Sequence, residues 1–392
     1  MKGHLRERER GVWELIVPLG RDPITGRYRR VSRTFRGTKR EAQRALASVV
    51  TEVSGGRETG SDVTVAELME RWLALAADNL SPTTLRGYRM VVDSKVVPAL
   101  GRIPIRKLRP DQLDALYQAL LRDRNLAPAT VRQVHAVVRK ALGQAVKWGW
   151  IAMNPAANAT PPRARKAEIN APTIDQLRAL IAEADRTNPD FAVFLRLSAA
   201  TGLRRGEACA LRWNDFDLVA GSLVVARSVI SDTGRDLIEK DTKTHAVRKI
   251  RVDDETVAML RELRSRQEES ARACGVGLPH DAFVFSEVAD GSRPWHPDTA
   301  TNRFEIVRKK VGLEHVRLHD LRHMHATELL AAGVPVRTVS GRLGHANAAT
   351  TLNVYAHFLE ASDAEAATVI GELLASPKPR AKVTTSKRSQ RA

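Results

Sequence analysis

The chain has 392 residues, 43% of them hydrophobic, which is enough for two or three domains with real cores rather than disorder. No run approaches the about 18 apolar residues of a membrane span, Glu14 interrupts the apolar stretch near the N-terminus, and 2 cysteines exclude a disulfide framework, so we expect a cytoplasmic protein. The net charge of +18 is concentrated at the ends, with 13 Lys and Arg against 5 Asp and Glu in residues 1–44 and 6 against none in residues 376–392, which favours a polyanion such as DNA as partner.

The N-terminal segment predicts two strands and a helix. Residues 11–19 and 27–35 read as strands around a Pro- and Gly-containing turn, and Thr38 with Glu41 forms a capping box that opens a helix over 38–53. A small basic sheet on one helix suits binding in a DNA groove, and a hairpin with a charged solvent face is the alternative. The candidate DNA contacts in this segment are Arg27, Arg29, Arg30, Arg33 and Arg36.

A helical region follows the linker-like stretch SGGRETGSD at 54–62. Thr64 and Glu67 form another capping box, and Ser81 with Pro82 marks a second helix start. The expected helices span residues 64–77, 82–96, 110–123 and 128–147. In the last of these, valines and Leu142 recur at helical spacing, while further candidate DNA contacts occupy other positions: Arg132, Arg139 and Lys140. A Pro-rich basic linker at 154–166 ends the region.

The third region mixes helices and strands. Thr173 and Gln176 cap a further helix start. We expect helices at 173–185, at 190–201 and near Arg204, strands at 222–230, 235–252 and 282–287, and helices again from Asp298 to about Leu374. The sequence contains no Gly-x-x-x-x-Gly-Lys loop and no dinucleotide glycine fingerprint, so neither ATP nor a nicotinamide is expected.

Two motifs place chemistry-bearing residues three positions apart. ATGLRRGEACALRW contains Arg204 and Glu207, and HDLRHMHATELL contains His319 and Arg322, so each pair shares one helix face. A guanidinium held by a carboxylate can be aimed at a ligand. An ordinary helical ion pair is the commoner meaning of an isolated Arg-x-x-Glu.

Six of the 11 histidines fall between residues 315 and 357, which raises the question of a metal site. Their spacing is poor for one, because no His-Glu-x-x-His is present and acidic residues nearby are few. We therefore predict no metal site. A metallohydrolase remains an alternative enzyme.

The remaining motifs complete an ordered series. KDTKTHAVRKIRV carries Lys243 near an expected hairpin bend, RLGH carries His345, and VYAH carries Tyr355 ten residues later. Taken in order, TGLRRGE, TKT, HDLRH, RLGH and VYAH resemble the tyrosine recombinase family, specifically the phage and integrative-element integrases. The resemblance covers most of residues 173–360. The helical region before it resembles the family's core-binding domain, and residues 1–52 look like its arm-binding module.

The resemblance implies a multidomain, mainly α fold with small β-sheets. It comprises an arm-type DNA-binding domain of a three-stranded sheet plus helix, an all-α, SAM-like core-binding domain, and an α+β catalytic domain. The expected boundaries are 1–55, 62–155 and 168–375, followed by a basic, disordered tail at 376–392.

The resemblance also implies roles for individual residues. Arg204 and Arg322 would clamp the phosphate, with Glu207 supporting. His319 and His345 would be the two histidines, Lys243 the hairpin lysine and Tyr355 the nucleophile. Lys240 contests the role of Lys243, and Met324 stands where relatives often carry threonine. His323, His325 and His357 have no assigned step.

The chemistry of phosphodiester cleavage agrees with these roles. Charge builds up on the non-bridging oxygens, and two forked guanidiniums can meet it with bidentate hydrogen bonds. A phenol with a pKa of about 10 is protonated at neutral pH, so Tyr355 needs a base, for which His319 is the candidate. His345 would donate to the phosphate, and Lys243 would protonate the leaving 5′ oxygen. A 3′-phosphotyrosine conserves the bond energy, so the family needs no ATP, metal or other cofactor.

The implied partners are double-stranded DNA at attachment sites, a homotetramer formed on that DNA, a directionality factor and a host DNA-bending protein, in a bacterial host and at its nucleoid. The alternatives are a chromosome-dimer-resolving recombinase, which lacks the N-terminal module, a topoisomerase of the same chemistry, and a DNA-binding regulator that has lost catalysis. By the same resemblance, the segment of residues 361–375 would pack on a neighbouring subunit.

Overall fold

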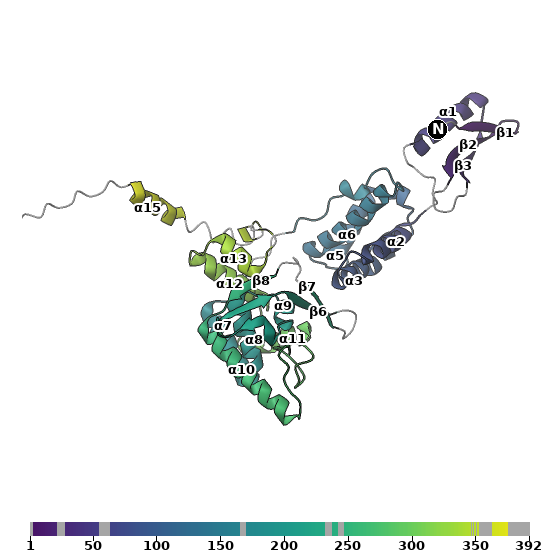
Figure 1. Cartoon of the computed structure of the whole chain (residues 1–392). Coiled ribbons are helices and arrows are strands. Elements are labelled where there is room, and N and C mark those ends of the chain that lie inside the picture. Colours follow the sequence, from purple (N-terminus) through teal and green to yellow (C-terminus); the bar gives the residue numbers. More distant parts are fainter. Residues whose placement is uncertain are drawn as a thin grey trace, which may run out of the picture. The chain divides into compact units, whose positions relative to one another are not determined.

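The computed structural model describes residues 3–21, 28–54, 63–164, 170–231, 237–241, 247–345, 347, 349, 351–352 and 363–374. The chain divides into two compact units, residues 1–167 and 168–392 (Figure 1). The fold is mainly helical with small sheets, and this confirms the predicted fold class.

The N-terminal segment is a three-stranded antiparallel sheet with one helix. Its elements are β1 (His4–Glu9), β2 (Val12–Arg21), β3 (Tyr28–Arg36) and α1 (Lys39–Ser54). Trp13, Leu15 and Val17 of β2 form a core with α1, because alternate residues of a strand face the same side. The predicted capping box is present, since the Thr38 backbone N–H donates to Glu41 Oε2 at 2.8 Å and the Glu41 N–H donates to Thr38 Oγ1 at 3.4 Å.

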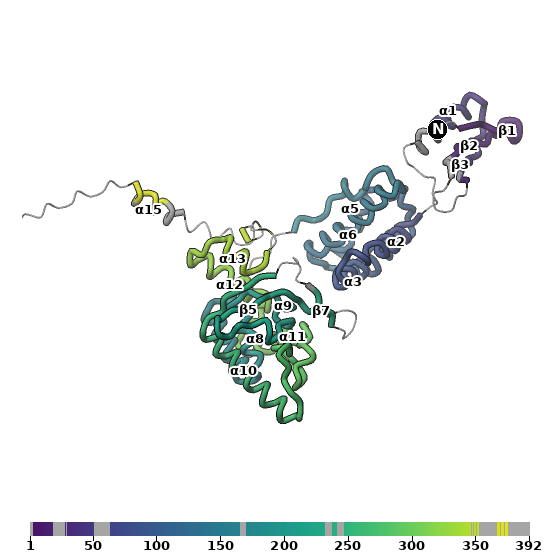
Figure 2. The backbone as a smooth tube through the Cα atoms, in the orientation of Figure 1, coloured from purple at the N-terminus to yellow at the C-terminus, as the bar shows by residue number. Residues whose placement is uncertain are grey.

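The same unit contains a helical bundle. Its elements are α2 (Val65–Ala77), α3 (Pro82–Val91), the π-helix η1 (Val92–Val96), α4 (Val97–Leu100), the 3₁₀-helices η2 (Ile105–Lys107) and η3 (Pro155–Ala157), α5 (Pro110–Arg122) and α6 (Pro128–Lys147). The helix starts at Val65, Pro82, Pro110 and Pro128 agree with the predicted ones to within one residue, because Thr64 makes its capping box and proline occupies the first position of the other three. Helix α6 lies against α2 and α5 (Figure 2). Valines of α6 are buried in the core of this bundle.

The second unit is organised around one buried helix. Its elements are α7 (Ile174–Thr187), α8 (Pro189–Thr201), α9 (Arg205–Cys209), the 3₁₀-helix η4 (Trp213–Asp215), β4 (Phe216–Asp217), β5 (Ser222–Val225), β6 (Arg227–Ser231), β7 (Leu237–Asp241), β8 (Arg248–Arg251), α10 (Asp254–Ala273), α11 (Pro297–Lys310), α12 (Asp320–Ala331), α13 (Val336–Leu343) and α15 (Asp363–Leu374). Helix α8 is buried along most of its length, and α7, α10 and α12 pack against it. Phe191 and Phe194 of α8 pack with Phe285 and Trp295 in an aromatic cluster at the centre of this core.

The strands of the second unit form two separate sheets, β4–β5–β8 and β6–β7, both antiparallel. The single strand predicted at 222–230 is therefore two strands, which part at Ala226 and pair with different partners. The strand predicted at 282–287 is wrong: this stretch makes only isolated bridges, to Arg212 and Pro294. Its backbone bonds to loops on both sides, because the Val284 N–H donates to the Leu211 carbonyl and the Trp295 N–H to the Phe285 carbonyl.

The two cysteines differ in their surroundings. Cys209 is buried in the main core, and burial raises the pKa of its thiol to about 12. Cys274 follows the last residue of α10 and is exposed.

Candidate active site

The motif TGLRRGE forms the turn between α8 and α9. Gly202 ends α8 in the left-handed conformation, with φ +66°, so the chain turns sharply there. Arg204 directly precedes α9, and the Arg204 Nη1 donates to Glu207 Oε1 at 2.8 Å, while its backbone N–H donates to Oε2 at 3.0 Å. The predicted contact between Arg204 and Glu207 is therefore present, across the first turn of a short helix.

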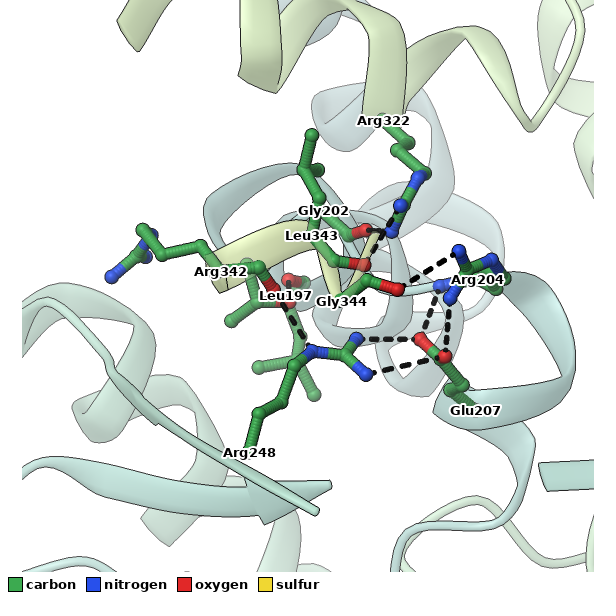
Figure 3. Close-up of polar contacts among 10 residues, drawn as sticks. Leu197, Gly202, Arg204, Glu207, Arg248, Arg322, Arg342, Leu343 and Gly344 are labelled. Carbon is green, nitrogen blue, oxygen red and sulfur yellow. Dashed lines mark hydrogen bonds and ion pairs between the residues drawn. The ribbon is translucent and has the colours of Figure 1, made fainter. Parts of the chain in front are cut away.

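Glu207 is 1% exposed and is shared by a second arginine from a strand. The Arg248 Nη2 of β8 donates to Glu207 Oε2 at 2.7 Å, and its Nη1 to Oε1 at 3.3 Å (Figure 3). Burial by itself raises the pKa of Glu207, but the hydrogen bonds and charges of Arg248 and Arg204 outweigh it and hold the pKa below its usual value. Glu207 is therefore a carboxylate at neutral pH.

Arg322 of α12 lies against the same turn. Its side chain is 4% exposed, and it donates from Nη1 to the Gly202 carbonyl at 2.6 Å and from Nη2 to the Leu343 carbonyl at 2.7 Å (Figure 3). Arg204 approaches the next carbonyl of that segment, with its Nη2 3.4 Å from the oxygen of Gly344. The two arginines are thus 118 positions apart in the sequence but converge on adjacent main-chain carbonyls.

Glycines permit this close packing. A Cβ atom at Gly202 would lie 2.7 Å from Leu343 Cδ2 and 2.8 Å from His325 Cδ2, and a Cβ at Gly344, where φ is +65°, would lie 2.8 Å from Arg248 Nη1. The glycines of the Thr-Gly and Leu-Gly-His motifs are therefore required both by backbone conformation and by space.

The predicted histidines border the arginines. His345 follows Gly344, and its Nδ1 lies 2.8 Å from the buried Thr351 hydroxyl. Partial burial and then the charges of Arg322 and Arg204 lower its pKa to about 4. His319 directly precedes α12 and meets the His323 ring edge-on, with centroids 5.0 Å apart. His319 remains exposed at the surface. The surrounding protein nevertheless desolvates the imidazole, and this desolvation, followed by the charges of His323 and Arg322, lowers its pKa to about 4. Both imidazoles are therefore neutral at pH 7.

The residues of this site lie within a match to one protein family. The model of the phage integrase family matches residues 173–361, a range that contains all of them, and that of the phage integrase N-terminal SAM-like domain matches residues 64–121. The chain belongs to the phage integrase family. These proteins are tyrosine-type site-specific recombinases, and the predicted family is confirmed.

Relatives match almost the whole of this integrase-family chain. The ICEBs1 integrase of Bacillus subtilis (strain 168) is 24% identical over 94% of this chain and 100% of its own length. The Tn1549 transposon integrase, solved in complex with a circular intermediate DNA, is 20% identical and has a TM-score of 0.67 over 80% of this chain and 100% of that one. A lambda integrase tetramer bound to a Holliday junction is 20% identical, with a TM-score of 0.54 over 88% and 95% of the two chains. At these identities the solved structures support the fold.

Two predicted site residues of the family pattern, Lys243 and Tyr355, lie outside the described residues. Lys240, the rival of Lys243, is described in β7, where it pairs with Ser228 of β6. β7 and β8, the strands before and after Lys243 in the sequence, lie in different sheets, so the hairpin expected between them is wrong. His323, which has no assigned step, lies beside His319, and His325 is buried with its Nδ1 2.9 Å from the Ala199 carbonyl. Among the described residues, no group of three or more His, Cys, Asp or Glu could hold a metal ion.

The candidate DNA contacts of the N-terminal sheet fall on two faces. Val31 packs towards α1. Because alternate residues of a strand face opposite sides, positions 29 and 33 of β3 lie on the same side as Val31. Arg30 and Arg36 lie on the opposite, open face. Arg30, Arg33 and Arg36 are exposed, and Arg27 lies outside the described residues. In the helical region, Arg132 and Arg139 are exposed two turns apart on one face of α6. Lys140 is also exposed, and its Nζ donates to the Tyr88 hydroxyl at 2.6 Å.

Arg248 and Arg342 take part in this network although sequence reasoning did not select them. Arg248 Nε donates to the Arg342 carbonyl at 2.9 Å, and Arg342 Nη2 donates to the carbonyls of Ala200 and Arg251, each at 3.2 Å. The available signal for Arg248 was a charged residue next to the alternating apolar position Ile250 in VRKIRV.

No described helix is long and apolar enough to cross a membrane.

Proposed function

We propose that this protein is a site-specific integrase that cuts and rejoins DNA through a 3′-phosphotyrosine on Tyr355 and thereby integrates a phage or mobile element. The observation that carries the proposal is the convergence of Arg204, Arg322 and His345 on the Gly202 and Gly344 turns. Arg204 and Arg248 share the carboxylate of Glu207, and Arg322 bonds the Gly202 carbonyl of the neighbouring turn, so these four side chains together carry an excess of positive charge. Such a site suits a phosphodiester.

Arg204 and Arg322 are the proposed phosphate clamps, with Glu207 fixing the direction of Arg204. Arg204 remains 27% exposed in its side chain while Glu207 holds it at 2.8 Å, so its guanidinium is both oriented and open to a ligand. Because fixed donors need no reorganisation when charge develops on the phosphate oxygens, this arrangement favours the transition state.

The two neutral histidines fit complementary roles. The charges of Arg204 and Arg322 help to lower both imidazole pKa values. A bound phosphodiester would offset those charges, so both pKa values would rise towards the working pH when substrate arrives. His319 would then accept the phenolic proton of Tyr355, His345 would donate to a non-bridging oxygen, and Lys243 would protonate the leaving 5′ oxygen.

The wider assembly is part of the proposal. We assign the DNA-contact role to the open face of the N-terminal sheet, with Arg30 and Arg36, and to the exposed basic residues of α6. The reaction would take place at attachment sites within a homotetramer, assisted by a directionality factor and a host DNA-bending protein, at the nucleoid in the cytoplasm of a bacterial host. The apolar residues Ile370, Leu373 and Leu374 of α15 are exposed, which suits packing on a neighbouring subunit. The proposed domains are 1–55, 62–155 and 168–375, with a tail at 376–392.

The test uses a nicked suicide DNA substrate that carries the element's own junction, incubated with EDTA and run on a denaturing gel. We expect a covalent protein–DNA adduct with wild type and none with Tyr355→Phe. Specific binding without an adduct would refute cleavage and favour a DNA-binding regulator. Adduct formation that EDTA abolishes would favour a metallohydrolase. Relaxation of supercoiled DNA that lacks a site would indicate a topoisomerase, and resolution of chromosome dimers without residues 1–60 would favour the simpler recombinase.

A further inference from the structure

Glu207 connects two elements that are distant in the sequence. It bonds the side chain and backbone of Arg204 at the start of α9, and it accepts both terminal nitrogens of Arg248 from β8 (Figure 3). Both the carboxylate and the Arg248 side chain are withdrawn from solvent, at 1% and 8% exposure. A buried carboxylate with a single arginine is less well satisfied than one with two, so Arg248 stabilises Glu207 in its charged form.

The Arg248 guanidinium has a second attachment, to the end of α13. Its Nε donates to the Arg342 carbonyl at 2.9 Å, and its Nη1 packs close to Gly344, where an added Cβ would lie 2.8 Å from it. Its three nitrogens therefore all face protein that belongs to the site. This arrangement differs from that of a residue that contacts DNA directly, which would extend its charged group into solvent.

The three segments joined by Arg248 each lead to a member of the proposed active site. Glu207 holds Arg204, the Arg342 carbonyl lies two residues before Gly344 and three before His345, and Arg248 itself lies five residues after Lys243. We propose that Arg248 is a positioning residue for DNA cleavage, which sets Arg204 through Glu207 and fixes the turn before His345 through the Arg342 carbonyl. This inference rests on the proposed function and adds to it a residue that does not touch the substrate.

The expected consequence of losing Arg248 is a slower reaction with intact DNA binding. Without Arg248, the Glu207 carboxylate would draw the Arg204 guanidinium towards itself and away from a phosphate, because among the described residues Arg204 is its other cationic partner. The turn at Gly344 would also lose its support. A displacement of about 1 Å in a catalytic group costs about 100-fold in rate.

The experiment compares full-length wild type with Arg248→Met, which keeps the aliphatic stem and removes the donors. We measure the Kd for the core site and the single-turnover rate of adduct formation on the nicked substrate. The expected result is a Kd within about twofold of wild type and a rate reduced about 100-fold. Arg248→Lys should recover part of the rate, because one ammonium can still pair with Glu207. Lys249→Met, an exposed residue of the same strand, should match wild type.

A double variant separates positioning from a general loss of structure. If Arg248 acts through Glu207, Glu207→Gln combined with Arg248→Met should cleave no more slowly than the slower single variant, because both partners of the buried pair are then removed. Multiplied rate losses, a wild-type rate for Arg248→Met, or a Kd that weakens as much as the rate falls would each overturn the inference. The double variant carries this test if Arg248→Met alone is unstable. A wild-type protein that forms no adduct would remove the proposed function, and the inference with it.

Discussion

Replacing Arg204 with lysine tests whether the guanidinium itself is needed. In the structure Arg204 divides its fork, with Nη1 on Glu207 at 2.8 Å and Nη2 3.4 Å from the Gly344 carbonyl. A lysine has one ammonium, so it can keep the contact with Glu207 but cannot also direct a second donor at a phosphate oxygen. The missing donor is equivalent to one lost oxyanion contact, about 2.7–4 kcal/mol or about 10²–10³-fold in rate.

The fold should tolerate this change. The Arg204 backbone N–H would still donate to Glu207, and Arg248 would still pair with that carboxylate, so no buried charge is left without a partner. We therefore expect the free energy of unfolding to change by no more than about 1.5 kcal/mol, the net value of one ordinary hydrogen bond.

The assay is single-turnover adduct formation on the nicked substrate, with the melting temperature as a check on folding. Arg205→Lys is the matched control, because Arg205 is the neighbouring residue but bonds Asp298 and Thr301 instead. Adduct formation by Arg204→Lys within about threefold of wild type, far from the loss of at least about 100-fold, would refute the assignment of Arg204 as a phosphate clamp. Equal losses in both variants would show that the effect is not specific to Arg204.

Three further results are expected. Gly202→Ala should destabilise the protein by about 2–5 kcal/mol in denaturant unfolding, because it adds left-handed backbone strain and contacts with Leu343 and His325. Gly333→Ala, where φ is +76° and the surrounding space is open, should cost only the backbone strain, about 1–2 kcal/mol. Equal losses of stability in the two variants would contradict the packing argument. Burial, and then the charge of Arg342, lowers the pKa of His325 to about 4, below the unfolded value of about 6.5. The unfolded state therefore binds the proton first, and thermal stability should fall as the pH drops from about 6.5 to about 4. Over this pH range a His325→Gln variant should lose less stability than wild type, by on the order of 2 kcal/mol, and an identical pH profile would refute the assignment. A protein lacking residues 1–60 keeps Val63 and the Thr64 cap, so it should still cleave core sites while integrating poorly, and unaltered integration would exclude the arm-binding role.

Local signals predicted most helices well. Capping boxes at Thr64 and Thr173 and prolines at Pro82 and Pro128 fix helix starts through backbone hydrogen bonding, which depends on neighbouring residues alone. Helix α10 was not predicted, although Asp253 caps it and Val257, Leu260 and Leu263 recur at helical spacing. Its mean hydropathy is low because most of its other residues are charged, which obscured the apolar stripe.

The strands and the Arg248 network show where such reasoning ends. The break at Ala226 depends on which strands pair across the sheets, and the run from Ala282 to Phe285 is buried by loops on both sides rather than by a ladder. Motif spacing identified Arg204, Glu207 and Arg322, but Arg248 joins them only through the fold. A residue that positions other side chains through tertiary contacts has no characteristic spacing from them in the sequence, so motif analysis does not identify it.

The contrast between the two thiols offers a practical handle on the protein. A maleimide reacts with an accessible thiolate. Cys209 is buried in the core, and its thiol pKa lies far above neutral pH, so it should not react. Cys274 lies at the exposed end of α10. The native chain can therefore carry a single fluorophore at a defined position without mutagenesis. Labelled copies with two dye colours would then report the pairing of subunits on DNA by energy transfer, in a protein whose sequence is unaltered.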